Sequence, residues 1–192
     1  MNIDVHILTL PNSNRKYLAK AIASLQHDPV NLYIVPGVAG DIGSGRMMGF
    51  CHGIAPYVSF VDEDDLVELG AFSRISDAIV ENPDCAFYTN EILIDSDGNK
   101  IGDGFSKDPT PFKGNRGLHL AQVPGQPGKY MHHLVCYPRV SLAGLDLSNA
   151  ERFSPETTIN NHVAKTAKFV ELPFVGYRWR IHSGNSSSHL WK

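Results

Sequence analysis

Four consecutive acidic residues, Asp62-Glu63-Asp64-Asp65, follow directly on the apolar run Tyr57-Val58-Ser59-Phe60-Val61. A short run of β-branched and aromatic residues indicates a buried strand of a parallel sheet. Four adjacent carboxylates repel one another, and a bound cation relieves that repulsion. Open α/β sheets bind ligands at the carboxyl ends of their strands. The stretch therefore predicts a site for a hard divalent metal and its anion, although a solvated turn with Asp64 or Asp65 as a helix cap also fits.

Two further segments of the sequence form a pattern together with this acidic stretch. Gly45-Arg46-Met47-Met48-Gly49-Phe50 places an arginine sixteen positions before Asp62, and Tyr177-Arg178-Trp179-Arg180-Ile181-His182 stands near the C-terminus. In this order the three pieces resemble the family 2 nucleotide-sugar glycosyltransferases of GT-A fold. That family carries an Arg-Asn-x-Gly segment, an apolar strand ending in Asp-x-Asp, and a late Tyr-Arg-x-His-x-x-Ser stretch. The resemblance covers residues 5–188 and departs at Met47, where the family usually has asparagine.

The resemblance implies an α/β fold with a mostly parallel central sheet flanked by helices, in one compact domain over residues 1–192. Residues 1–100 would bind the nucleotide sugar, and residues 101–192 would supply the acceptor side and the metal-binding histidine. The implied reaction is an inverting transfer of a sugar from a nucleoside diphosphate sugar to an acceptor hydroxyl. The implied cofactor is Mn²⁺ or Mg²⁺.

The resemblance also assigns metal ligands. Asp64 would bind the metal directly, and Asp62 would face the ribose and the metal. His182, 118 residues beyond Asp64, would supply an imidazole. Carboxylates with one imidazole suit Mn²⁺ or Mg²⁺. For His182 the alternative is a surface histidine in a polar tail.

Nucleotide-sugar contacts are implied at the end of the first strand, at Arg46 and in the late segment. Arg46 matches the family's arginine that helps to hold the base and the ribose. The family's acid after the second strand is displaced, so Asp41 is the nearest substitute, unless it is an ordinary loop aspartate. Of Arg178 and Arg180, one could neutralise phosphate while the other is a solvated strand residue. The implied set is Thr9, Leu10, Pro11, Asp41, Arg46, Asp62 and Arg178.

The catalytic base is assigned to Glu156. Residues 143–146 match the family's Gly-Gly-Phe-Asp-like segment, and Glu156 falls where the family has Glu-Asp, with Thr157 at the second acid. A base there would deprotonate the acceptor hydroxyl as it attacks. A glutamate in a first helical turn is equally explained by the helix dipole. Asp65, which could also act behind the metal ligands or on the acceptor side, and Asp146 are the next candidates.

His132 and His133 are possible acceptor contacts. Both are assigned to a strand at residues 132–137. Neighbouring strand residues point to opposite faces, so at most one of the two is expected to be functional.

Periodicity and chain breakers predict the elements that position these residues. Residues 5–10 form a first strand, Pro11-Asn12-Ser13-Asn14 offers helix caps, and the apolar residues that follow repeat every 3.6 positions. With a second strand at residues 32–35, the opening is a parallel β-α-β unit with a right-handed crossover. Ser154-Pro155-Glu156 predicts another helix start. Further strands are predicted at residues 87–89, 92–94, 169–172 and 177–181, helices at 46–53 and before Pro83, a flexible loop at 40–45 and a hairpin turn at 96–99.

Residues 102–129 are rich in glycine and proline and are expected to form a mobile loop over the site. Four basic residues in this loop could contact the phosphates of a nucleic-acid acceptor, although a solvated loop explains them equally. They are Lys107, Lys113, Arg116 and Lys129.

Composition narrows the class of protein. The formal net charge of −3 argues against a dedicated nucleic-acid-binding module, which usually carries an excess of basic residues. Three scattered cysteines predict reduced thiols. No apolar run reaches the ~20 residues that span a bilayer, and the N-terminus lacks a signal-peptide pattern, so a soluble, cytoplasmic protein is expected.

Two other functions fit parts of the pattern. Thr157 at the second acid would suit a sugar-nucleotide-binding protein that has lost catalysis. A nucleotidyltransferase also uses paired acids to hold metals, but it requires a second carboxylate pair on a neighbouring strand. The acceptor stays open among a small soluble molecule, a protein side chain and a hydroxylated base in viral DNA.

Overall fold

The computed structural model describes residues 2–104, 121–148, 150 and 155–182. Its first strand, β1 (Ile3–Thr9), pairs in parallel with β2 (Val30–Pro36) and with β3 (Tyr57–Asp62). Helix α1 (Arg15–Ser24) connects β1 to β2 and begins at Asn14, whose side chain accepts a hydrogen bond from the Lys16 amide. The predicted parallel β-α-β opening is confirmed.

The sheet is mixed. Its strand order is β2-β1-β3-β9-β5-β10-β4, with β6 (Lys100–Asp103) paired to β5 (Ala86–Ile94). Strand β9 (Val135–Pro138) is antiparallel to both β3 and β5, and β10 (Phe169–Arg180) is parallel to β5. Strands β1, β2, β3, β5 and β10 therefore all run in one direction, and their carboxyl ends share one edge of the sheet.

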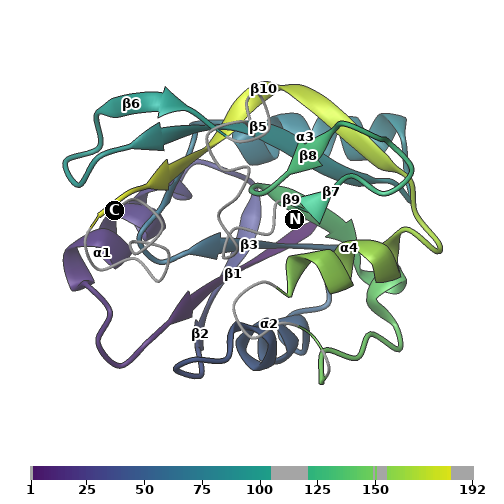
Figure 1. Ribbon diagram of the computed structural model, residues 1–192, viewed down its shortest axis with the longest axis horizontal. Coiled ribbons are helices and arrows are strands. Elements are labelled where there is room, and N and C mark those ends of the chain that lie inside the picture. Colours follow the sequence, from purple (N-terminus) through teal and green to yellow (C-terminus); the bar gives the residue numbers. More distant parts are fainter. Residues whose placement is uncertain (1, 105–120, 149, 151–154, 183–192) are drawn as a thin grey trace.

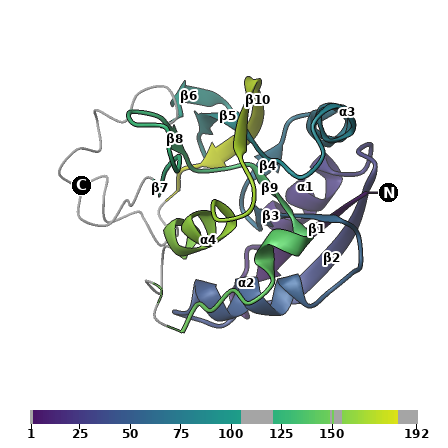
Figure 2. The ribbon, with the colours of Figure 1, turned by 90° about the vertical axis from the view of Figure 1, so that its right-hand side faces the viewer.

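Helices cover both faces of this sheet (Figures 1 and 2). On one face, α1 and α3 (Ala71–Glu81) share a core with Tyr57 and Val61 of β3. On the other, α4 (Glu156–Val163), the 3-10 helix η2 (Arg139–Leu142) and α2 (Ile42–Phe50) lie against Val58 and Phe60. The two-residue alternation of β3 thus divides its side chains between two cores. This arrangement confirms the α/β class in a single compact domain.

Helix α2 begins earlier than predicted and replaces much of the expected flexible loop. The Asp41 side chain caps it by accepting a hydrogen bond from the Ser44 amide at 3.0 Å. Its glycines allow close packing on β1. A Cβ atom at Gly45 would lie 3.0 Å from a Leu8 methyl group, and one at Gly49 would lie 3.3 Å from the His6 ring. The helix that carries Arg46 therefore lies directly on the sheet.

Two pairs of predicted short strands are single long strands. Strand β5 runs through Asn90 and Glu91, and β10 runs through Pro173 and Gly176 with two register shifts. Gly176 is required there, because a Cβ atom would lie 2.5 Å from the Thr89 hydroxyl oxygen. The hairpin turn at 96–99 is confirmed between β5 and β6.

The predicted loop is only partly described. Residues 105–120 lie outside the described residues, and with them Lys107, Lys113 and Arg116. The described remainder has order, because β7 (Ala121–Gln122) pairs with β8 (Tyr130–Met131). Lys129 contacts Glu171 at 2.9 Å. Ser154 also lies outside, whereas Glu156 begins α4 as expected.

All three cysteines lie in described parts of the chain, and each is a free thiol. Across the described ranges, the helices are too short or too polar to cross a membrane.

Stability should fall as the pH is lowered from about 6.5 to about 4. Burial lowers the pKa of His6 on β1 from 6.5 to about 4, against the opposing hydrogen bond to the His52 carbonyl. Between these pH values the unfolded chain binds a proton that the folded protein excludes, which costs at most about 3 kcal/mol. Urea unfolding of the wild type and His6→Phe between about pH 7.5 and pH 4 measures this effect. The variant should lose less stability over this range, and equal losses would contradict the prediction.

Candidate functional site

The four acidic residues after β3 each have their own partners. Glu63 accepts hydrogen bonds from the Ser13 hydroxyl and the Leu10 amide. The other three carboxylates contact Arg46, His182 and Tyr177, as described below. Each of the four carboxylates therefore has a polar partner within the fold, so the acidic cluster alone does not require a cation.

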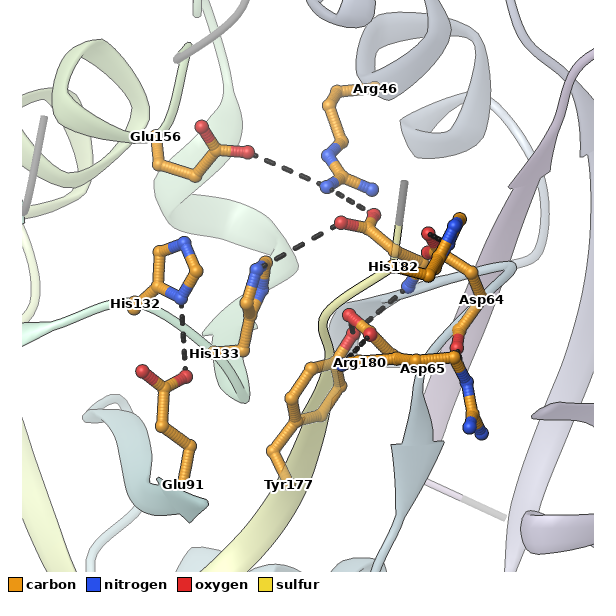
Figure 3. A network of polar contacts seen from close by, with 11 residues as sticks. Arg46, Asp64, Asp65, Glu91, His132, His133, Glu156, Tyr177, Arg180 and His182 are labelled. Atoms are coloured by element: carbon orange, nitrogen blue, oxygen red, sulfur yellow. Dashed lines mark hydrogen bonds and ion pairs between the residues drawn. The ribbon is translucent and has the colours of Figure 1, made fainter. Parts of the chain in front are cut away.

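Asp64 and His182 lie together although 118 residues separate them in the chain. The His182 Nε2 atom is 2.9 Å from Asp64 Oδ2, and Figure 3 shows the two side chains side by side. The His182 ring also packs on Tyr17 of α1, with 5.0 Å between ring centroids. A buried arginine holds the backbone here, because Arg180 Nε donates to the Asp64 carbonyl at 2.6 Å. One carboxylate and one imidazole are thus presented at the carboxyl edge of the sheet.

A pocket of about 670 Å³ opens beside this pair. Most of its lining residues are polar, and they come from the loop after β1, the start of α1, the acidic cluster and the ends of β5 and β10. The lining residues are Leu10, Asn12, Asn14, Tyr17, Glu63, Asp64, Asp95, Ser96, Ile181 and His182.

Asp62 points to a different set of partners. Arg46 Nη2 donates to Asp62 Oδ1 at 2.8 Å and lies 3.5 Å from Glu156 Oε1 (Figure 3). Burial alone would raise the pKa of Asp62, but Arg46, with His133 and His132, outweighs it and lowers the pKa to about 2. Asp62 is therefore ionised throughout the ordinary pH range.

Asp65 is fully buried beneath the site. Its carboxylate accepts hydrogen bonds from the Tyr177 hydroxyl at 2.8 Å and from the Arg180 amide at 2.6 Å. Burial, with the nearby charges of Asp64 and Asp62, holds the pKa of Asp65 well above its usual value. This position suits a residue that ties β3 to β10.

The two histidines do not alternate. His132 and His133 lie between β8 and β9, outside both strands, and their ring centroids are 3.9 Å apart. The prediction that they belong to a strand and point to opposite faces is wrong. His132 contacts the buried Glu91 at 3.2 Å, and His133 lies 3.9 Å from Asp62.

Burial alone would lower the pKa of His132, but Glu91, with Glu156 and Asp62, outweighs it and raises the pKa. For His133, burial and the neighbouring His132 hold the pKa well below its usual value. One imidazole of the pair is therefore disposed to carry a proton and the other to stay neutral.

The other residues implied by the resemblance occupy several places in the fold, and one of them, Leu10, lines the same pocket as Asp64 and His182. Arg178 pairs with Glu68, and Asp146 accepts a hydrogen bond from the Ser148 amide in a turn. Arg180 is fully buried, so it is not the solvated one of the two arginines. Thr9, Leu10 and Pro11 line the end of β1, as expected from their position.

The donor set fits a hard divalent cation in two places. Asp64 and His182 supply a carboxylate and an imidazole beside the pocket. Asp62, Asp65 and His133 bring three potential ligand atoms within 4.8 Å of one another. The second group is the poorer fit, because Arg46 occupies Asp62 and two hydrogen bonds occupy Asp65.

Two residues of the site, Tyr177 and Glu91, were not predicted to take part in it, whereas His133 was a possible acceptor contact and Arg180 a possible phosphate contact. In Figure 3 the Tyr177 hydroxyl reaches Asp65, and the Glu91 carboxylate points to His132. Tyr177 belongs to the late motif that ends at His182, so its place near the site could have been inferred from that motif. No sequence pattern indicated Glu91, because an isolated glutamate near a turn is ordinary.

The fold resembles that of TarS from S. aureus, a glycosyltransferase. One TarS structure matches 95% of this chain with a TM-score of 0.65 and 12% identity, over 37% of its own length. TarS 1–349 in complex with UDP-GlcNAc matches 98% of this chain with a TM-score of 0.64 and 14% identity, over 61% of its length. TarS 1–349 in complex with UDP matches 95% of this chain with a TM-score of 0.63 and 14% identity, also over 61%.

No protein-family model and no curated protein sequence matches this chain significantly. The chain spans between 37% and 61% of the TarS chains above. At such low identity the likeness concerns the fold. We conclude that the chain shares the α/β fold of TarS, with Asp64 and His182 paired at the carboxyl edge of its sheet.

Proposed function

We propose that this protein is a metal-dependent, inverting glycosyltransferase of the family 2 type. It would move a sugar from a nucleoside diphosphate sugar to an acceptor hydroxyl. The observation that carries the proposal is the Asp64–His182 pair at the end of β3, in a fold shared with TarS. The sequence pattern and the fold are independent arguments for the same class of enzyme.

In this proposal the donor nucleotide lies across the carboxyl ends of β1, β2 and β3. Thr9, Leu10 and Pro11 would line the base, with Asp62 near the ribose. Two of the TarS structures hold UDP-GlcNAc and UDP, which supports a nucleotide-sugar donor. Asp41 caps α2, and Arg178 pairs with Glu68. Either side chain would have to leave its present partner before it could contact the nucleotide sugar.

Asp64 and His182 would hold Mn²⁺ or Mg²⁺, with Asp62 close to the same region. Such a cation acts as a Lewis acid toward a diphosphate leaving group. The acidic lining of the pocket favours the same arrangement, because Glu63, Asp64 and Asp95 would otherwise repel a diphosphate.

Glu156 is our candidate base. Its carboxylate would accept the proton of the acceptor hydroxyl while the acceptor oxygen attacks the anomeric carbon. The bond from that carbon to the diphosphate oxygen would break on the opposite face, and the diphosphate would leave with the electron pair. One displacement of this kind inverts the anomeric centre.

The acceptor could be a small molecule, a protein side chain or a hydroxylated base in DNA. A sugar-nucleotide-binding protein without transfer activity is the second candidate. Thr157, at the family's second acid, and the Arg46 contact of Glu156 favour this alternative.

Thermal unfolding with a panel of nucleotide sugars and Mn²⁺ tests the proposal first. A ligand at 100 times its dissociation constant adds about 2.7 kcal/mol of stability. Any stabilising donor is then supplied with a radioactive sugar, and its hydrolysis or transfer is followed. Transfer supports the enzyme, binding without turnover supports the second candidate, and no binding by any nucleotide sugar refutes both.

A further inference from the structure

Arg46 is almost completely removed from solvent, with a side chain only 3% exposed. Its guanidinium lies over the Phe60 ring, 4.5 Å from the centroid. The close approach of α2 to β1 at Gly45 and Gly49 places it there. A buried cation is costly unless it is paired, so its partners define what it does.

Those partners are two carboxylates from distant parts of the chain. Asp62 ends β3, on the side where we place the donor, and Glu156 begins α4, on the side where we place the acceptor. One nitrogen, Nη2, contacts both, at 2.8 Å and 3.5 Å. Figure 3 shows Arg46 at the head of this network, with Glu156 on one side.

The remaining nitrogens of Arg46 add a second observation. Nε and Nη1 are buried and have no hydrogen-bond partner in the part of the chain that the structure describes. The pairing that holds the guanidinium in the core is therefore made through one nitrogen alone. Removing that nitrogen would leave both carboxylates without their shared cation.

We propose that Arg46 is a positioning residue that joins Asp62 to Glu156 and aims the carboxylate of Glu156 at the acceptor. The inference rests on the proposed function. It replaces a direct contact between Arg46 and the nucleotide with an effect on the reaction through the two carboxylates. Arginine suits this role better than lysine, because a planar guanidinium holds two acceptors in fixed directions.

The test compares Arg46→Met and Arg46→Lys with the wild type. Arg74→Met is the matched control, because Arg74 is exposed on α3 and lies over the Phe174 ring. Three quantities are measured: the affinity for UDP with Mn²⁺ by calorimetry, kcat and KM with the donor found by the screen, and the melting temperature.

We expect Arg46→Met to lower kcat by about 100-fold or more, with the UDP affinity and the donor KM changed by less than about threefold. Arg46→Lys should restore part of kcat, since it keeps the charge without the fixed geometry. Arg74→Met should match the wild type in all three quantities.

Thermal unfolding supplies a readout that needs no activity. Arg46→Met should lower the melting temperature. Glu156→Gln should change the melting temperature less in the Arg46→Met background than in the wild type. Additive effects would show that the two side chains are not coupled and would overturn the inference.

The outcomes separate the inference from the proposed function. An active wild type whose Arg46→Met variant keeps its kcat, or loses UDP affinity as its main defect, overturns the positioning role. A wild type that transfers no sugar from any donor refutes the proposed function instead, and the positioning role in catalysis is overturned with it. Coupling in thermal unfolding would then leave only a structural contact.

Discussion

Alanine at Asp64 or at His182 should weaken Mn²⁺ binding by about 100-fold and lower turnover by about 100- to 1,000-fold. Their ligand atoms lie 2.9 Å apart and face one pocket, so each variant would remove one ligand from the same ion. Calorimetric titration with Mn²⁺ measures the affinity, and turnover at limiting Mn²⁺ measures the consequence. The exposed residues Asp77 and His27 supply matched controls, as Asp77→Ala and His27→Ala.

The double variant should be little worse than either single variant, because two ligands of one ion act as a unit. Without metal, Asp64→Ala should keep or raise the melting temperature, since the Asp64 charge opposes ionisation of the buried Asp65. A structural role would give the reverse pattern, with lower melting temperatures and unaltered metal affinity. Full activity of His182→Ala at limiting Mn²⁺ would remove the histidine from the site.

The first half of the fold was predictable because its signals are local. Short apolar runs mark β1 and β3, and a capped amphipathic helix connects β1 to β2. The acidic end of β3 and the late histidine were also predictable, because the order of three motifs carries that information. The structure brings Asp64 and His182 to 2.9 Å, and their role as metal ligands stays a prediction.

The second half was harder because its strands contain chain breakers and charges. Pro173 and Gly176 read as interruptions, yet β10 absorbs them as register shifts. Glu91 is an unusual residue for a buried strand, and its contact with His132 helps to explain its position. Such pairings join residues about 40 positions apart, so no local pattern reveals them.

The partners of the acidic cluster were likewise invisible in the sequence. Repulsion among four carboxylates suggested a cation, but Tyr177 and Arg46 already satisfy two of them. Arg180 illustrates the same limit. A strand arginine reads as solvated, whereas here it is fully buried and bonds the Asp64, Asp95 and Ser96 carbonyls.

Arg139→Met should cost about 3–5 kcal/mol of stability, because it leaves the charge of Asp4 buried without its partner. Arg139 Nη2 lies 2.6 Å from the fully buried Asp4 carboxylate, and its other nitrogens donate to the Ala55 and Phe50 carbonyls at 2.7 Å. Urea unfolding should show the loss of stability, and thermal unfolding should show a fall in melting temperature of about 10 °C.

The control is Lys129→Ala, which breaks an exposed ion pair and should cost less than about 1 kcal/mol of stability. Arg139 and Asp4 lie at the start of β1, at the edge of the sheet opposite Asp64, so metal affinity should be unaltered in Arg139→Met. If Arg139→Met also cost less than about 1 kcal/mol, the Arg139–Asp4 pair would behave as a surface contact. Loss of Mn²⁺ binding with stability retained would instead tie Arg139 to the candidate site.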